Sequence, residues 1–241
     1  MIKRLFRRFV AGSDFPATAP ETPFIAVGDI HGRADLLERF LGSAPSCPII
    51  FVGDYVDRGD NSAEVLGLLS SRSDIVCLSG NHEEMMLKFL DDPIQRGARW
   101  LRYGGLQTLA SFGVAGVTDS SGPDALEQAR DRLRQAMGPE LISWIRGLPK
   151  SWQSGNVAVV HASANPSVGI SDQSTKALHW GHPDFTKVMR TDGVWIIHGH
   201  TIVDEPTAVR GRIAIDTGAY ATGRLTIVHV EPGKTTFETI T

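Results

Sequence analysis

Short apolar runs alternate with helical patterns through the first third of the chain. The runs at 24–27, 48–52 and 75–78 are each followed within two residues by a glycine, which is typical of strands buried in a sheet. A segment with helical spacing of its apolar residues follows each run, at 33–42, 62–71 and 83–90. Because strands that alternate with helices pair in parallel, this half predicts a parallel α/β sheet.

The pattern changes after residue 90. Residues 91–149 contain no strand-like run and predict a helical insertion, broken at Gly138-Pro139 because proline cannot continue a helix. The last two of the later strand-like runs flank a turn at 217–223, which predicts an antiparallel second half. These later runs lie at 157–160, 194–197, 212–215 and 225–230. We therefore expect a layered α/β/β/α sandwich with a helical insertion.

The N-terminal residues have a different character from the rest. Residues 1–10 mix four basic residues with apolar ones, and 11–23 are rich in Pro, Ala and Thr. We expect a flexible basic tail and linker over 1–23 and a single domain over 24–241, with the insertion at 91–149. A short helix on a membrane surface is the alternative for the tail. No secretory signal is recognisable, and no run reaches the ~18 apolar residues of a membrane span.

Composition narrows the function classes. The 241 residues carry 24 Lys and Arg against 27 Asp and Glu, a net charge of −3, so we expect no nucleic-acid partner that binds a basic surface. The two cysteines, Cys47 and Cys77, exclude a disulfide framework and a thiolate zinc site. They suit the reducing cytoplasm, where we expect the protein to act.

Polar clusters stand at the ends of the predicted strands. The first three strands lead into Gly28-Asp29-Ile30-His31-Gly32, Gly53-Asp54-Tyr55-Val56-Asp57-Arg58-Gly59 and Gly80-Asn81-His82-Glu83, and the later ones into His161 and His198-Gly199-His200. Taken singly, Gly-Asp after a strand indicates a turn, and a histidine there indicates a packed core residue. Packing does not require five such clusters in order, whereas ligands bind at the carboxyl ends of parallel strands. Oxygen and imidazole donors without thiolate suit Mn, Fe or Zn.

The ordered motifs GDIHG, GDYVDRG, GNHE, VHA and GHT, within residues 24–228, resemble the calcineurin-like metallophosphoesterases. Within them, the chain looks most like the phosphoprotein phosphatase family and its bacterial serine/threonine branch. The resemblance implies two divalent metal ions, Mn in the first place and Fe or Zn as alternatives. Asp54 would bridge the ions, as a carboxylate can. The other implied ligands are Asp29 and His31 for the first metal, and Asn81, His161 and His200 for the second.

The same resemblance implies the catalytic groups. Arg58 would bind the phosphate, and His82 would protonate the leaving alkoxide while Asp57 holds its other ring nitrogen. Asn81 and His82 would also contact the substrate. Glu83 and Glu84 follow directly and are interpreted as structural.

Two positions depart from the family pattern. Ser79 stands where an arginine commonly precedes Gly-Asn-His-Glu, and His182 stands where the family commonly has the arginine of Trp-x-Arg. His182 would then make a weaker contact with the phosphate. Alternatively, an arginine of the insertion reaches the phosphate. The candidates are Arg96, Arg99 and Arg102.

The resemblance implies a phosphomonoesterase for phosphoserine and phosphothreonine, with phosphotyrosine as a further candidate. The substrate would be a phosphorylated protein or a small phosphoester. Hydrolysis would proceed by direct attack on its phosphorus by a hydroxide that bridges the two metal ions. One alternative is a symmetrical dinucleoside-tetraphosphate hydrolase, which Asp57 and Glu83 disfavour. Another is an inactive scaffold, which retention of all six ligands disfavours.

Overall fold

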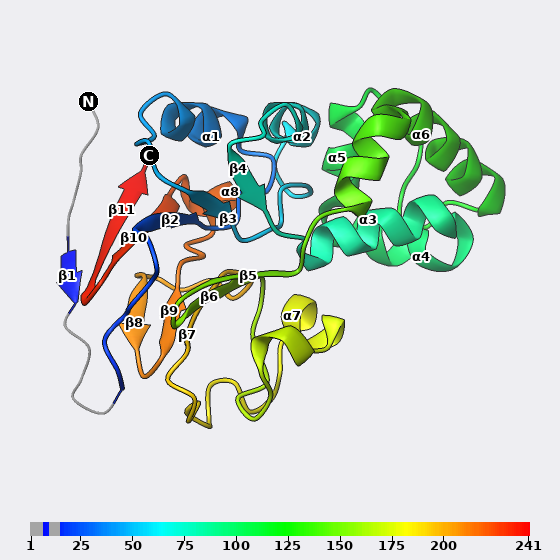
Figure 1. Cartoon of the computed structure of the whole chain (residues 1–241). Coiled ribbons are helices and arrows are strands. Elements are labelled where there is room, and N and C mark those ends of the chain that lie inside the picture. Colours follow the sequence, from blue (N-terminus) through cyan, green and yellow to red (C-terminus); the bar gives the residue numbers. More distant parts are fainter. Residues whose placement is uncertain (1–6, 10–14) are drawn as a thin grey trace.

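Two β-sheets form the centre of the molecule (Figure 1). The computed structural model describes residues 7–9 and 15–241. In the first sheet β2, β3 and β4 pair in parallel, as the sequence predicts, and β10 joins β2 antiparallel. The strands, in spatial order, are β1 (Arg7–Phe9), β11 (Lys234–Ile240), β10 (Leu225–Glu231), β2 (Phe24–Val27), β3 (Ile49–Phe51) and β4 (Ile75–Cys77).

The second sheet corrects one expectation. Its order is β5 (Ser151–Ser154), β6 (Val157–Val160), β7 (Trp195–His198), β9 (Arg212–Ala214) and β8 (Thr207–Val209). Strands β6, β7 and β9 are parallel, with an antiparallel strand at each edge. The predicted antiparallel pairing of 212–215 with 225–230 is wrong, because β9 and β10 belong to different sheets. Ile213 and Val228 both enter the core between the sheets, so apolar contact replaces the expected hydrogen bonds.

Three apolar clusters confirm the α/β/β/α layering. One lies between the two sheets, where residues such as Phe24 and Trp195 are buried. On the outer face of the first sheet pack α1 (Ala34–Leu41) and α2 (Ser62–Ser70). On the outer face of the second sheet, α7 (Thr175–Trp180) and Phe185 form the third cluster.

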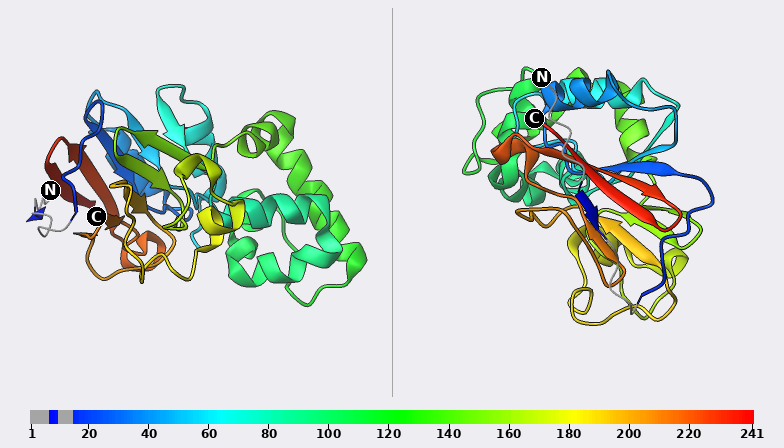
Figure 2. Two further views of the ribbon diagram at one scale, coloured as in Figure 1. Left: turned by 60° about the horizontal axis from the view of Figure 1, so that its bottom comes forward. Right: turned by 90° about the vertical axis from the view of Figure 1, so that its left-hand side faces the viewer.

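A lobe of helices projects from the sheets on the side away from β11 (Figure 2). Gly97 allows close packing inside it, because a Cβ there would press on Leu126 and Phe89. The longest helix is kinked at Gly138, where φ is 73° just before Pro139, as the sequence predicts. The lobe contains α3 (Asn81–Asp91), α4 (Pro93–Trp100), the π-helical turn η1 (Leu101–Gly105), α5 (Leu106–Ser111) and α6 (Pro123–Arg146). Within the described chain, no helix has the length and apolar character needed to cross a membrane.

The segment before β2 packs onto the second sheet. The Phe15 ring meets Trp195 edge-on at 5.2 Å, and the Trp195 indole N–H donates to the Pro16 carbonyl at 2.7 Å. Asn156 also donates to the carbonyl of Ala17 at 2.9 Å. The packed chain thus includes residues that the sequence assigns to the linker at 1–23. Of the predicted basic tail, residues 1–6 and 10–14 lie outside the described residues, and 7–9 form β1.

Candidate metal centre

The loops after β2, β3 and β7 meet at one end of the sheets in unusual backbone conformations. His31, Asp54 and His200 have φ of 45°, 54° and 64°, which for residues other than glycine costs roughly 1 kcal/mol each. The loops approach each other so closely that glycine is required at the points of contact. A Cβ on Gly80 would collide with Asp54 Oδ1, and one on Gly199 with Asp29 Oδ1. The glycines thus serve to bring the polar side chains together.

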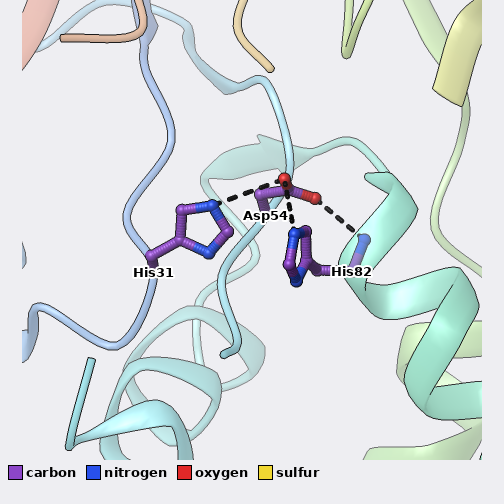
Figure 3. A group of neighbouring side chains, drawn as sticks. All are labelled: His31, Asp54 and His82. Carbon is purple, nitrogen blue, oxygen red and sulfur yellow. Dashed lines mark hydrogen bonds and ion pairs between the residues drawn. The ribbon is translucent and has the colours of Figure 1, made fainter. Parts of the chain in front are cut away.

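Asp54 lies at the centre of this cluster. Figure 3 shows its carboxylate between the rings of His31 and His82, with Oδ2 3.5 Å from His31 Nε2 and 3.9 Å from His82 Nε2. The other oxygen, Oδ1, lies 3.3 Å from His161 Nε2. Asp54 therefore belongs to both groups of side chains whose donor atoms converge within 4.8 Å. These groups are His31, Asp54 and His82, and Asp54, His161 and His200.

The tautomers of two histidines favour metal binding. His31 Nδ1 donates to the Val56 carbonyl at 2.7 Å and His161 Nδ1 to the Val52 carbonyl at 3.1 Å. Nε2 of each ring therefore faces Asp54, and in the neutral His31 ring it carries a lone pair. Burial lowers the pKa of His161, but the charge of Asp54 raises it above its usual value. Burial lowers the pKa of His31 to about 3, so no proton lies between His31 and the carboxylate at neutral pH. The 3.5 Å separation accommodates a cation bound to both atoms, since such ligand distances are ~2.0–2.2 Å.

Asp29 adds a second indication of a cation. Its side chain is buried, and Oδ2 accepts a hydrogen bond from the His200 backbone N–H at 2.9 Å, but Oδ1 has no hydrogen-bond partner among the described residues. Burial, with the negative charges of Asp216 and Asp54, raises its pKa well above the usual value. Buried carboxylates this close together need positive charge to stay ionised.

Asn81 connects the histidines of the second group. Its Oδ1 lies 2.8 Å from both His161 Nε2 and His200 Nδ1. Burial lowers the pKa of His200 to about 4, which keeps its ring neutral and able to bind a metal. The structure therefore brings together all six predicted ligands, from Asp29 to His200.

His82 is held by a buried chain of hydrogen bonds. Its Nδ1 lies 2.6 Å from Asp57 Oδ2, and Asp57 accepts further bonds from the Trp100 indole N–H at 3.0 and 3.1 Å and from the Thr108 hydroxyl at 2.6 Å. Burial lowers the pKa of His82, but the charges of Asp54 and Asp57 raise it above its usual value. Neither Thr108 nor Trp100 is among the site residues predicted from the sequence.

Arg58 lies at the edge of the cluster. Its Nη2 is 3.3 Å from His82 Nε2, and its guanidinium lies over the Tyr220 ring at 4.8 Å. The Arg58 backbone N–H donates to the Gly104 carbonyl of η1 at 3.3 Å. The helical lobe therefore supports both Asp57 and Arg58.

Glu83 is structural, as the sequence predicts, and its contacts show how. Its Oε2 accepts the backbone N–H groups of Asp54 and Gly80, both at 2.9 Å, and Oε1 accepts that of Tyr55 at 2.7 Å. This one carboxylate ties the loop after β3 to the start of α3. Burial raises its pKa to about 7.

Three of the substitutes proposed for the missing arginines make other contacts in the described chain. Among the described residues, no hydrogen bond or ion pair joins His182 to the ligands or to Arg58. His182 Nδ1 instead accepts the Asp184 backbone N–H at 3.3 Å. Arg102 pairs with Asp119, and Arg99 lies over Trp180 at 4.9 Å.

Asp216 is a member of the cluster that is not among the site residues predicted from the sequence. It is buried, and its charge acts on Asp29. It lies two residues beyond the end of β9, so its place near a strand end was the available signal. His198, by contrast, packs edge-on against Phe185 at 5.0 Å, in keeping with the packing role expected for it.

Comparison with known proteins identifies one family and several solved structures with a similar fold. A family model described as calcineurin-like phosphoesterase matches residues 22–204. Among solved structures, a putative diadenosine tetraphosphatase has a TM-score of 0.61 at 19% identity, covering 95% of this chain and 97% of its own. The protein-tyrosine phosphatase of the psychrophile Shewanella sp. has a TM-score of 0.58 at 17% identity, covering 95% and 87%.

A protein serine/threonine phosphatase from Saccharomyces cerevisiae has a TM-score of 0.52 at 17% identity, covering 92% of this chain and 80% of its own. At these identities the likenesses show a common fold. A comparison with curated proteins gives no match.

Proposed function

Because the chain belongs to the calcineurin-like phosphoesterase family, we propose that it is a metal-dependent phosphatase of the phosphoprotein phosphatase type, in its bacterial serine/threonine branch. Its substrates are phosphoserine and phosphothreonine in proteins or peptides. The observation that carries the proposal is the buried pair of His82 and Asp57, 2.6 Å apart, with Arg58 in contact with the same imidazole. This pair suits a substrate whose leaving group needs a proton.

The metal ligands proposed are those of the sequence analysis. Asp29 and His31 would hold one ion, Asn81, His161 and His200 would hold the other, and Asp54 would contribute to both. The residues fit, because Asp29 Oδ1 is buried without a hydrogen-bond partner in the part of the chain that the structure describes, and the His31 lone pair faces Asp54. When bound, two divalent cations supply Lewis-acid activation of water and charge for the phosphate. The oxygen and imidazole donors favour Mn, with Fe or Zn as alternatives.

The chain's own groups bind the phosphate and move a proton. The planar guanidinium of Arg58 can donate two parallel hydrogen bonds to phosphate oxygens, and the Tyr220 ring fixes its plane. His82 Nε2 lies beside this guanidinium and donates its proton to the leaving oxygen. Asp57 holds Nδ1 and so orients the ring. An alkoxide is a strong base, so protonation matters most for serine and threonine esters.

The alternative is a symmetrical dinucleoside-tetraphosphate hydrolase. One structure with a similar fold is described as a putative diadenosine tetraphosphatase, but the likeness to phosphatases is of the same order. The Asp57–His82 hydrogen bond favours the phosphatase, because it supports a proton donor for an alkoxide.

A substrate panel tests the proposal. The protein, loaded with Mn, is assayed on phosphoserine and phosphothreonine peptides, an aryl phosphate and diadenosine tetraphosphate. We expect phosphate release from the peptides and its abolition by EDTA. Cleavage of diadenosine tetraphosphate alone would refute the phosphatase, and inactivity on the whole panel with Mn bound would favour the inactive scaffold.

A further inference from the structure

A small cavity lies between α3, α4 and α7, next to the candidate centre. Its floor is apolar, and Trp100 forms part of it while donating its indole N–H to Asp57. Met85 lines the cavity one turn after His82 on α3. The cavity therefore shares a wall with the groups proposed to move the proton. Its full lining is Met85, Lys88, Arg96, Arg99, Trp100 and Trp180.

The wall formed by Trp180 is fixed in place. Its indole N–H donates to Glu84 Oε2 at 3.1 Å, and the same oxygen lies 2.6 Å from His179 Nδ1. Arg99 lies over the face of the indole at 4.9 Å, a cation–π contact that orients the guanidinium. The cavity therefore presents one ordered cationic group beside an aromatic wall.

The charge around this cavity is largely unneutralised. Lys88 pairs with Glu84, but no ion pair joins Arg96 or Arg99 to an acidic residue of the described chain. Arg102, on the same side of the lobe, is paired with Asp119 at 2.9 Å. The protein as a whole carries a net charge of −3, so two unpaired arginines at one cavity form a local site for an anion.

In the described chain, the contacts of Arg99 favour a role other than the one considered for it from the sequence. No hydrogen bond within the described chain joins Arg99 to the proposed ligands, His82 or Arg58, and its guanidinium is stacked on Trp180. The anion that it meets is therefore a second group on the substrate, beside the phosphate that is hydrolysed.

We propose that this cavity binds an acidic side chain of the substrate peptide, near the phosphorylated serine or threonine. The inference rests on the proposed phosphatase function and names its preferred substrate class. The cavity measures about 50 Å³, against roughly 30 Å³ for one water molecule in the liquid. The cavity therefore has room for a carboxylate, and its two unpaired arginines favour Asp or Glu.

The test compares two phosphopeptides that differ only in flanking residues, Glu in one and Gln in the other. The variant is Arg96→Gln with Arg99→Gln, and the control is Arg102→Gln, which removes an exposed, paired arginine of the same lobe. For the Glu peptide we expect kcat/KM of the double variant to fall about tenfold, mainly through KM, as two exposed charge contacts allow. Hydrolysis of the Gln peptide and of an aryl phosphate stays within about twofold of wild type.

The outcomes separate this inference from the proposed function. Equal hydrolysis of both peptides by the wild-type protein, or equal loss on both in the double variant, overturns the acidic-residue site and leaves the phosphatase standing. A selective loss on diadenosine tetraphosphate also overturns it, because the site then serves a nucleotide. Failure to hydrolyse any phosphopeptide overturns both proposals.

Discussion

Thr108→Val tests whether the helical lobe supports the proposed proton donor. The substitution keeps the shape of the side chain and removes one hydroxyl. That hydroxyl donates to Asp57 Oδ1 at 2.6 Å and accepts the Asp57 backbone N–H at 2.8 Å. Ser62 retains a 3.1 Å contact with the same N–H, and Trp100 still donates to the carboxylate. Asp57 therefore loses two of its holding bonds, one at the carboxylate and one at the backbone N–H, but is not left isolated.

The expected effect follows from the charge on the acceptor. A buried hydrogen bond to a charged group contributes about 1.5–3 kcal/mol, so unfolding free energy should fall by about that amount. General acid catalysis contributes ~10²–10⁴-fold to the rate. Because Asp57 is held less firmly in the variant, we expect hydrolysis of a phosphoserine peptide to slow by about tenfold. An aryl phosphate needs little protonation, so its rate should fall less than about twofold.

The assay measures kcat for both substrates with saturating Mn, beside urea unfolding of each protein. Ser154→Ala is the matched control, because it removes a buried hydroxyl that accepts the Glu21 backbone N–H at 2.9 Å, in β5. Ser154→Ala should lower the unfolding free energy without changing the ratio of kcat for the peptide to kcat for the aryl phosphate. If Thr108→Val slows both substrates equally, or destabilises the protein without affecting the peptide reaction, the positioning role is refuted.

Three further predictions concern the same region. His82→Asn should reduce hydrolysis of phosphoserine peptide by about 10²-fold or more but that of an aryl phosphate far less; equal damage would contradict the general acid. Asp54→Asn should abolish Mn binding, measured by calorimetry, and both activities, while the exposed control Asp60→Asn should retain them. The pKa of Glu84 is about 2, because bonds from His179 and Lys88 outweigh its burial. Its charge thus stabilises the fold above the usual pKa of 4.5, and this stabilisation disappears as pH falls toward 2. Glu84→Gln should lower the Tm at pH 7 more than at pH 4, and an equal decrease at both would contradict the ion pair.

The central strands could be predicted because their environment leaves a clear pattern. The segments 24–27, 48–52 and 75–78 lie in a sheet covered on both faces, so their residues are apolar without alternation. The strands that the sequence analysis missed include edge strands with polar residues. Ser151–Ser154 and Thr207–Val209 each pair on one side only, and such strands need few apolar residues.

Sheet membership could not be predicted for the last strands. The link from Asp216 to Gly223 contains turn residues, which indicate a change of direction but not the strand that pairs next. In the structure it carries α8 (Ala219–Thr222) and crosses from the second sheet to the first. The choice depends on core contacts such as those of Ile213 and Val228, which involve residues far apart in the sequence.

The side chains expected as metal ligands could be named in advance because each stands within four residues after the end of a strand, in a recognisable motif. Their supports could not. Thr108 and Trp100 reach Asp57 across 51 and 43 positions of sequence, and neither stands in a strand-end motif. A hydroxyl or an indole in a helix is usually a packing residue, so only the folded lobe reveals these contacts.

Trp100 links the two proposals through one side chain. Its indole N–H holds Asp57, and its ring forms part of the cavity that Arg99 and Trp180 enclose. A substrate group bound in that cavity would press on the same ring that positions the proton donor. Trp100→Phe should therefore reduce kcat on the Glu and Gln phosphopeptides alike, through Asp57, whereas Arg96→Gln with Arg99→Gln should affect KM on the Glu peptide alone. If Trp100→Phe changed only the preference for Glu, the indole would serve the cavity and not the catalytic pair.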